Sequence, residues 1–295
     1  MYDIIKKYKL LSLHLMVLVL GFTGILGKLI SLNSLPLVWY RMTIAFLILL
    51  MVMIFKKTIL KINKRNFIPL LGAGMIVGLH WLFFFESIKV ANISIAVICL
   101  STSSLFSAFL EPIFFKRKLL KYEVLFGIIV LASLSYMLYE KPTSDMNFTL
   151  GYTYGIISAF LATLFTLING KFINKIDATE ITTIEMLGGV IIISIILLIN
   201  QDISIVDNIP SINDLFYLIL LSSICTAAVF VWMIEIMRYI TPYAVIMAVN
   251  LEPIYSIILA LFLFNKTESM NFSFYIGSSI ILLIVFLDGY IKNRK

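Results

Sequence analysis

Charged residues are scarce in this sequence, as are histidine, cysteine and proline. Only 13% of the 295 residues are Asp, Glu, Lys or Arg, against about 25% in soluble globular proteins. By contrast, 61% are hydrophobic and the mean hydropathy is +1.04. These values exclude a soluble globular protein and predict an integral membrane protein. The net charge of +7 is typical of loop residues that set membrane topology, so we expect no nucleic-acid partner.

The sequence also lacks the signatures of catalysis and of metal binding. Two histidines cannot build a three-histidine metal site, and Cys99 and Cys225 lie inside apolar runs, where buried thiols act as small hydrophobes. There is no G-x-x-x-x-G-K-[ST] for ATP, no H-E-x-x-H and no G-x-S-x-G. We therefore expect no enzyme, no cofactor and no metal.

Long apolar runs, in contrast, are abundant. A helix of about 20 apolar residues crosses a bilayer. Ten such runs predict ten transmembrane helices, at 11–30, 36–55, 67–86, 93–114, 122–139, 150–169, 179–199, 214–234, 242–264 and 273–291. The first is too long for a typical signal-peptide core and has no A-x-A-like site after it, so we interpret it as a retained helix.

The basic residues predict the orientation of these helices. With ten spans, 18 of the 23 Lys and Arg residues fall on one side, four on the other and Arg41 within a span. Because positive loops stay in the cytoplasm, both termini are predicted to be cytoplasmic. The expected location is the cell inner (plasma) membrane.

The two halves of the chain resemble each other in order. "ILGKLI" and "INGKFI" match Lys28 with Lys171, "LVWYRMTIAF" and "ITTIEMLGGV" match Arg41 with Glu185, and the later junctions read "ESIKVANISIAVI" and "EIMRYITPYAVIM". Matched positions are 143 to 150 residues apart. Five helices per half is an odd number, so the second repeat must be inverted in the membrane. The sequence therefore predicts an all-α membrane protein with two inverted five-helix repeats, at 1–141 and 142–295, and a substrate site at the midplane between them.

Glu252 is the leading site candidate. It stands about ten residues into an apolar span, ~15 Å deep, beside Pro253 and the amide of Asn250. A charge at that depth is costly and normally faces a wet cavity or the bundle interior. It either binds cargo or a proton in a cavity, or bonds to a neighbouring helix. In the repeat register Glu252 matches Thr102.

Other polar and aromatic residues inside the spans are weaker candidates. Arg41 and Glu185 occupy matched positions near opposite faces, where each lines a vestibule or snorkels. His80 couples protons or packs through hydrogen bonds. Tyr40 and Trp81 stack on cargo or pack in the core. Thr102 and Ser103, within the run "STSS", line the cavity or allow close helix approach.

These residues also resemble a known family. Residues 225–269, which end in "MAVNLEPIYSIILALFLFNKTES", and the matching "GLHWLFFFESIKVANISIAVICLSTSSLF" are similar to EamA-type permeases of the drug/metabolite transporter superfamily. The resemblance covers essentially the whole chain. It implies a secondary transporter with a central cavity, often an exporter of amino acids or other small metabolites.

We therefore predict an exporter of amino acids or similar small metabolites that works by alternating access. Its expected partners are a small-molecule metabolite, membrane lipid and, as a candidate coupling ion, the proton. The alternatives are a cationic-drug permease, which would need Glu252 as its principal anion, and a nucleotide-sugar permease, which would need a basic cavity. A lipid scramblase and a membrane-embedded enzyme rank below them.

Overall fold

The chain forms a bundle of helices, and its computed structural model describes residues 8–56, 63–116, 118–139, 147–200, 209–249, 251–268 and 271–293. No strand occurs within these ranges. The helices are α2 (Lys9–Leu29), α3 (Ser34–Phe55), α4 (Lys64–Val90), α5 (Ile93–Leu100), α6 (Ser103–Phe115), α7 (Lys121–Tyr139), α8 (Phe148–Phe172), α9 (Ala178–Ile199), α10 (Ile212–Ser222), η1 (Ser223–Ala228, a π-helix), α11 (Val229–Ile236), α12 (Pro242–Val249), α13 (Glu252–Glu268) and α14 (Phe272–Asn293).

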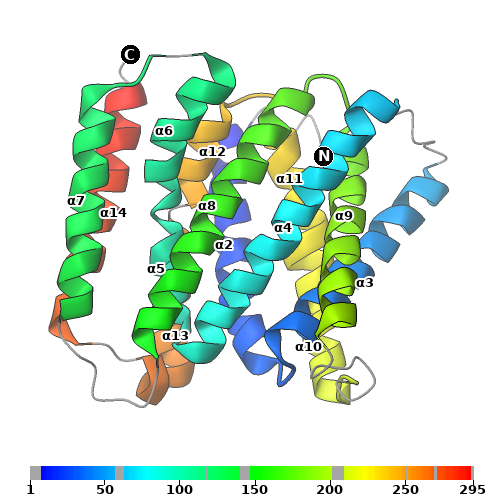
Figure 1. The fold of residues 1–295 in the computed structure, drawn as a ribbon, viewed down its shortest axis with the longest axis horizontal. Coiled ribbons are helices and arrows are strands. Elements are labelled where there is room, and N and C mark those ends of the chain that lie inside the picture. The colour runs from blue at the N-terminus through cyan, green and yellow to red at the C-terminus, as the bar shows by residue number, and fades with distance from the viewer. Residues whose placement is uncertain are drawn as a thin grey trace.

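The helices confirm a multi-pass membrane protein. Seven helical segments within the described residues are long and apolar enough to cross a membrane, and two shorter apolar helices lie at Ile254–Phe264 and Phe272–Ile284. The predicted spans 122–139, 242–264 and 273–291 correspond to α7, to α12 with α13, and to α14. The start of α2 and the end of α14 lie toward the same end of the bundle (Figure 1), as an even number of crossings requires. The count of ten spans stays a prediction.

Helix contacts between the two halves come in matched pairs. The third helix of the first half, α4, packs on α8 and α9, while α10, η1 and α11, the third of the second half, pack on α2 and α3. Likewise α5 and α6 pack on α8, as α12 and α13 pack on α2. The pairs α3–α9 and α7–α14 join equivalent helices, and α7 and α14 form one edge of the bundle (Figure 1). Exchange of the halves thus preserves the contacts.

Glycines bring α4 and α9 into direct backbone contact. A Cβ on Gly74 would collide with the backbone of Glu185, and one on Gly188 would collide with the Leu71 carbonyl oxygen. Gly78 faces Gly189 in the same crossing. Small residues of this kind are what membrane helices use to approach closely. The G-x-x-x-G motif that begins at Gly74 therefore allows α4 to pack directly on the backbone of α9.

Two spans depart from regular α-helical hydrogen bonding in the middle, at matched positions of the two halves; in the first, Ser101 and Thr102 keep right-handed helical φ and ψ and donate to carbonyls three residues earlier. The run expected at 93–114 stops at Leu100 and resumes at Ser103, and the run expected at 242–264 stops at Val249 and resumes at Glu252. Pro253 explains the second break, because its ring cannot follow a continuous helix and it offers no backbone donor. At the second break, Glu252 is the first residue of α13, and a helix N-terminus favours negative charge.

Candidate functional site

A cavity lies between the two halves, at the level of the helix breaks. Its walls come from α2, α3, α4, α5, α6, α8, α11, α12 and α13. Ser103 and Glu252, the first residues of α6 and α13, both line it. Thr23, Arg41, His80 and Thr166 are further polar members of the lining. The remaining lining is mostly apolar.

Arg41 is fully buried and only partly paired. Its Nε donates to the Thr226 hydroxyl at 2.7 Å, and one Nη is 3.4 Å from the Cys225 carbonyl oxygen. The guanidinium carbon lies 3.6 Å from the centre of the Trp81 ring, a cation–π contact. The other nitrogen, Nη1, has no hydrogen-bond partner among the residues that the structure describes. The arginine is therefore held in place on three sides and keeps one strong donor unused in a residue that lines the cavity.

Glu252 supplies the opposite charge. Its side chain is 4% exposed and lines the same cavity. No residue in the described ranges forms a hydrogen bond or ion pair with its carboxylate, although Arg41 is near enough for electrostatic attraction between the two. The start of α13 stabilises a negative charge at this residue. The side chains of Arg41 and Glu252 thus face one small chamber without a direct contact between them in the described residues.

Aromatic rings form the wall between the charges and the bundle core. Trp81 meets Phe230 edge-on with ring centres 5.0 Å apart, and Phe230 stacks on Phe165 at 5.8 Å. The His80 ring continues the series, 5.6 Å from Phe165 and 6.3 Å from Phe84. Such rings provide rigid apolar surface. The chamber therefore suits a ligand with charged groups and an apolar body.

His80 is tied to α8 as well as lining the cavity. Its Nδ1 lies 2.9 Å from the Ser158 carbonyl oxygen, and the Ser158 hydroxyl is 3.0 Å from the His80 carbonyl oxygen. This arrangement suits a neutral ring with the proton on Nδ1. His80 thus packs through hydrogen bonds and leaves Nε2 as its remaining polar atom.

The other sequence candidates lie elsewhere. Tyr40 packs edge-on against Trp39 at 5.2 Å and is outside the cavity lining. Thr102 is buried in the α5–α6 break, where its hydroxyl donates to the Cys99 carbonyl oxygen at 2.7 Å. Glu185 is fully buried in α9 and is also outside the lining. Asn250 lies outside the described residues. The substrate-binding roles of all nine candidates remain predictions.

The structure adds residues that the sequence did not single out. Phe84, Phe165 and Phe230 line the cavity, and so does Thr166. Thr226 holds Arg41 from within η1, where its hydroxyl also donates to the Leu221 carbonyl oxygen at 2.7 Å. π-Helical turns often occur at functional sites, but no simple sequence pattern marks them. Among the described residues, no group of three or more His, Cys, Asp or Glu could hold a metal ion.

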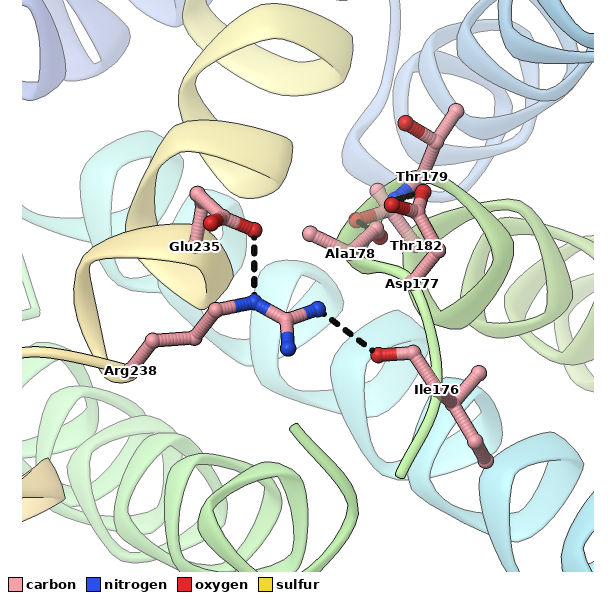
Figure 2. Close-up of polar contacts among 7 residues, drawn as sticks. All are labelled: Ile176, Asp177, Ala178, Thr179, Thr182, Glu235 and Arg238. Atoms are coloured by element: carbon pink, nitrogen blue, oxygen red, sulfur yellow. Dashed lines mark hydrogen bonds and ion pairs between the residues drawn. The ribbon is translucent and has the colours of Figure 1, made fainter. Parts of the chain in front are cut away.

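Matched basic residues join the helices at each end of the bundle. Near the end of α4, Lys89 Nζ donates to the Ile30 carbonyl oxygen at 2.6 Å. After the end of α11, Arg238 donates to the Ile176 carbonyl oxygen at 3.0 Å and pairs with Glu235 at 2.9 Å (Figure 2). The carbonyls of Ile30 and Ile176 lie just before α3 and α9, the second helices of the two halves. We call these two contacts the end latches.

Comparison with known proteins identifies the chain. The family model of the EamA-like transporter family matches residues 7–139 and again residues 149–288. The chain belongs to the EamA-like transporter family. Two matches of similar length cover most of this EamA-like chain, which agrees with the paired helix contacts. Membership makes it a membrane permease of small molecules, which the family resemblance in the sequence already indicated.

Solved structures show the same fold for this EamA-like protein. A crystal structure that is 12% identical superposes with a TM-score of 0.66 and covers 96% of this chain and 96% of its own. At that identity the likeness speaks for the fold alone. None of the curated proteins matches the sequence.

Proposed function

We propose that this EamA-like chain is a secondary transporter that exports a small zwitterionic metabolite by alternating access. An amino acid with a large apolar side chain is the first candidate cargo. One observation carries the proposal: Arg41, whose Nη1 has no hydrogen-bond partner among the described residues, and the carboxyl group of Glu252 line one cavity whose other walls are mainly apolar. A cargo carboxylate would meet Arg41, its ammonium group would meet Glu252, and its side chain would pack against the aromatic wall.

The alternatives fit the cavity less well. A cationic drug could pair with Glu252, but it would then sit near the buried charge of Arg41. A nucleotide sugar carries two phosphates, and Arg41 is the sole Lys or Arg in the cavity lining of the described chain. Because an unpaired buried charge is costly, a ligand that satisfies both Arg41 and Glu252 is favoured.

The end latches support alternating access. They occupy matched positions in the two halves and, by the predicted topology, lie at opposite membrane faces. Lys89 ties α4 to the connection before α3, and Arg238 ties α11 to the connection before α9. In an inverted-repeat transporter, rocking of one half against the other opens one face while closing the other. We propose that the two latches break in turn.

The cargo is tested in liposomes that contain the purified full chain. Labelled leucine should exchange across the membrane in counterflow, and empty liposomes give the background. Leucinamide lacks the carboxylate and 4-methylpentanoate lacks the amine, so each should compete at least about tenfold less well than leucine, the effect of losing one charged hydrogen bond. Equal competition by either analogue, or stronger competition by a quaternary amine, would reject a zwitterionic cargo.

The proposed orientation places both termini in the cytoplasm of a cell whose inner (plasma) membrane holds the protein. Ile209, before α10, is predicted to be outside, and Leu119, before α7, inside; both side chains are exposed. Cys99 and Cys225 are buried, so background labelling is low. An impermeant thiol reagent added to intact cells should label Ile209→Cys and spare Leu119→Cys. The reverse pattern would overturn the topology.

A further inference from the structure

A second polar site lies outside the cavity, between α8 and α9. Glu185 and Asn169 are both fully buried. Apart from each other, the carboxyl oxygens of Glu185 and the amide atoms of Asn169 have no hydrogen-bond partner among the described residues. The Asn169 amide lies beside the Glu185 carboxyl group and interacts with it. Buried polar groups in native proteins are almost always satisfied, and a single neutral amide is too little to satisfy an ionised carboxylate at this depth.

No charged group of the surrounding helices pairs with Glu185. Several charged or titratable side chains lie on the described parts of these helices, beside Glu185 or between it and the nearer membrane face. They are Arg41 on α3 and Lys56 directly after it, Lys64, Arg65 and His80 on α4, Lys171 on α8, Glu180 on α9 and Glu235 on α11. Arg41 is bound to Thr226, His80 to Ser158 and Glu235 to Arg238. An ionised carboxylate without a paired cation in an apolar interior is so costly that the group takes up a proton instead.

We infer that Glu185, supported by Asn169, is a proton-binding site that couples transport to the proton gradient. The inference rests on the proposed transport function. A proton fits better than a metal cation, because only three side-chain oxygens are present and cations require more ligands. The neutral carboxyl then needs only one acceptor for its O–H, which the adjacent Asn169 carbonyl can provide after a small shift.

The repeat register indicates how such a proton is released. Glu185 holds the position in the second half that Arg41 holds in the first, near the opposite face. In this conformation Arg41 lines the cavity, whereas Glu185 is fully buried and lies outside the cavity lining. On α8, Thr166 lines the cavity, and Asn169 follows one helical turn closer to the face of the Arg238 latch. Opening of that latch would extend the cavity along this turn and let water reach Glu185.

The site is tested first without any cargo. Infrared spectra of the detergent-solubilised full chain, titrated from about pH 5 to about pH 10, report the carbonyl band of protonated carboxyl groups. One component should disappear in Glu185→Gln and return at a shifted position in Glu185→Asp. The matched control, Glu180→Gln, removes an acid of the same helix that has partners and should keep the component. A component that survives in Glu185→Gln would overturn the proposal.

Coupling is tested in the leucine liposomes with the membrane potential clamped. At one proton per cargo molecule, a gradient of one pH unit can drive about tenfold accumulation. The ratio of gradient-driven to gradient-free uptake should fall to about one in Glu185→Gln. An unchanged ratio, or a wild-type response to a sodium gradient alone, would refute proton coupling at this residue. If the wild type carries no leucine, the cargo proposal fails, and the infrared result alone decides whether Glu185 binds a proton.

Discussion

Replacement of Arg41 by glutamine tests how the cavity would recognise its cargo. The change removes the charge and the free Nη1 donor of a side chain that is fully buried in the wild type. A hydrogen bond between charged groups contributes about 1.5–3 kcal/mol. Arg41→Gln should therefore weaken the binding of leucine by about 10- to 150-fold.

The cargo analogues separate this contact from a general effect on the fold. Leucinamide has no carboxylate to lose, so Arg41→Gln should change its dissociation constant by less than about threefold, well under one charged hydrogen bond. Glu252→Gln should show the mirrored pattern: a large loss for leucine and a small one for 4-methylpentanoate, which lacks the amine. Both variants should also slow leucine counterflow.

Calorimetric titration of the detergent-solubilised protein measures these constants, and thermal unfolding checks that each variant is folded. Each of the two side chains is thereby assigned one charge of the ligand. That assignment would be refuted if Arg41→Gln weakened leucine and leucinamide equally, because the arginine would then act through the shape of the cavity. Equal losses for leucine and 4-methylpentanoate in Glu252→Gln would likewise remove the glutamate from ammonium recognition.

Two further predictions concern opening and packing. In a Ser103→Cys background, Arg238→Ala should speed thiol labelling of the cavity from the predicted cytoplasmic face by about fivefold, because one partly exposed charged hydrogen bond contributes about 1 kcal/mol. Lys89→Ala should speed labelling only from the other face. Faster labelling from the same face in both variants would refute paired latches. Gly74→Ala should lower the unfolding temperature, because its Cβ would collide with the α9 backbone. Gly72 has open space around it, so Gly72→Ala should leave the unfolding temperature unchanged or raise it. Equal changes in the two variants would refute the close crossing of α4 and α9.

The positions of the helices could be predicted because an apolar run of bilayer length is rarely anything but a membrane helix. The break before Glu252 was foreseeable from Pro253, but the matching break at Ser101 and Thr102 was not, since no proline marks it. There, the backbone N–H groups of Ser101 and Thr102 and the hydroxyls of Thr102 and Ser103 donate to carbonyls three residues earlier in the chain. Serine and threonine offer such local bonds in many ordinary helices too.

Charged residues of the site were visible in the sequence, whereas the aromatic wall was not. Arg41 and Glu252 are conspicuous because charges are rare in apolar spans. Phe165 and Phe230 are not, because a helix in lipid is apolar all round and its cavity face has no distinct composition. Tyr40 illustrates the same limit: successive residues of a helix point about 100° apart, so the packing that turns Arg41 to the cavity turns Tyr40 away from it.

In the predicted repeat register, divergence between matched positions would let an inverted pair of repeats hold the asymmetric ligand proposed above. Arg41 matches Glu185, and Glu252 matches Thr102. If all four kept the same chemistry in both halves, the cavity would present the same groups from both sides and would favour a symmetric ligand. Instead, each half contributes one charge of opposite sign, Arg41 from the first and Glu252 from the second. The matched position in the other half can then serve another role. Thr102 forms a hydrogen bond to the Cys99 carbonyl oxygen between α5 and α6, and Glu185 is an acid that only the opposite conformation would expose to water.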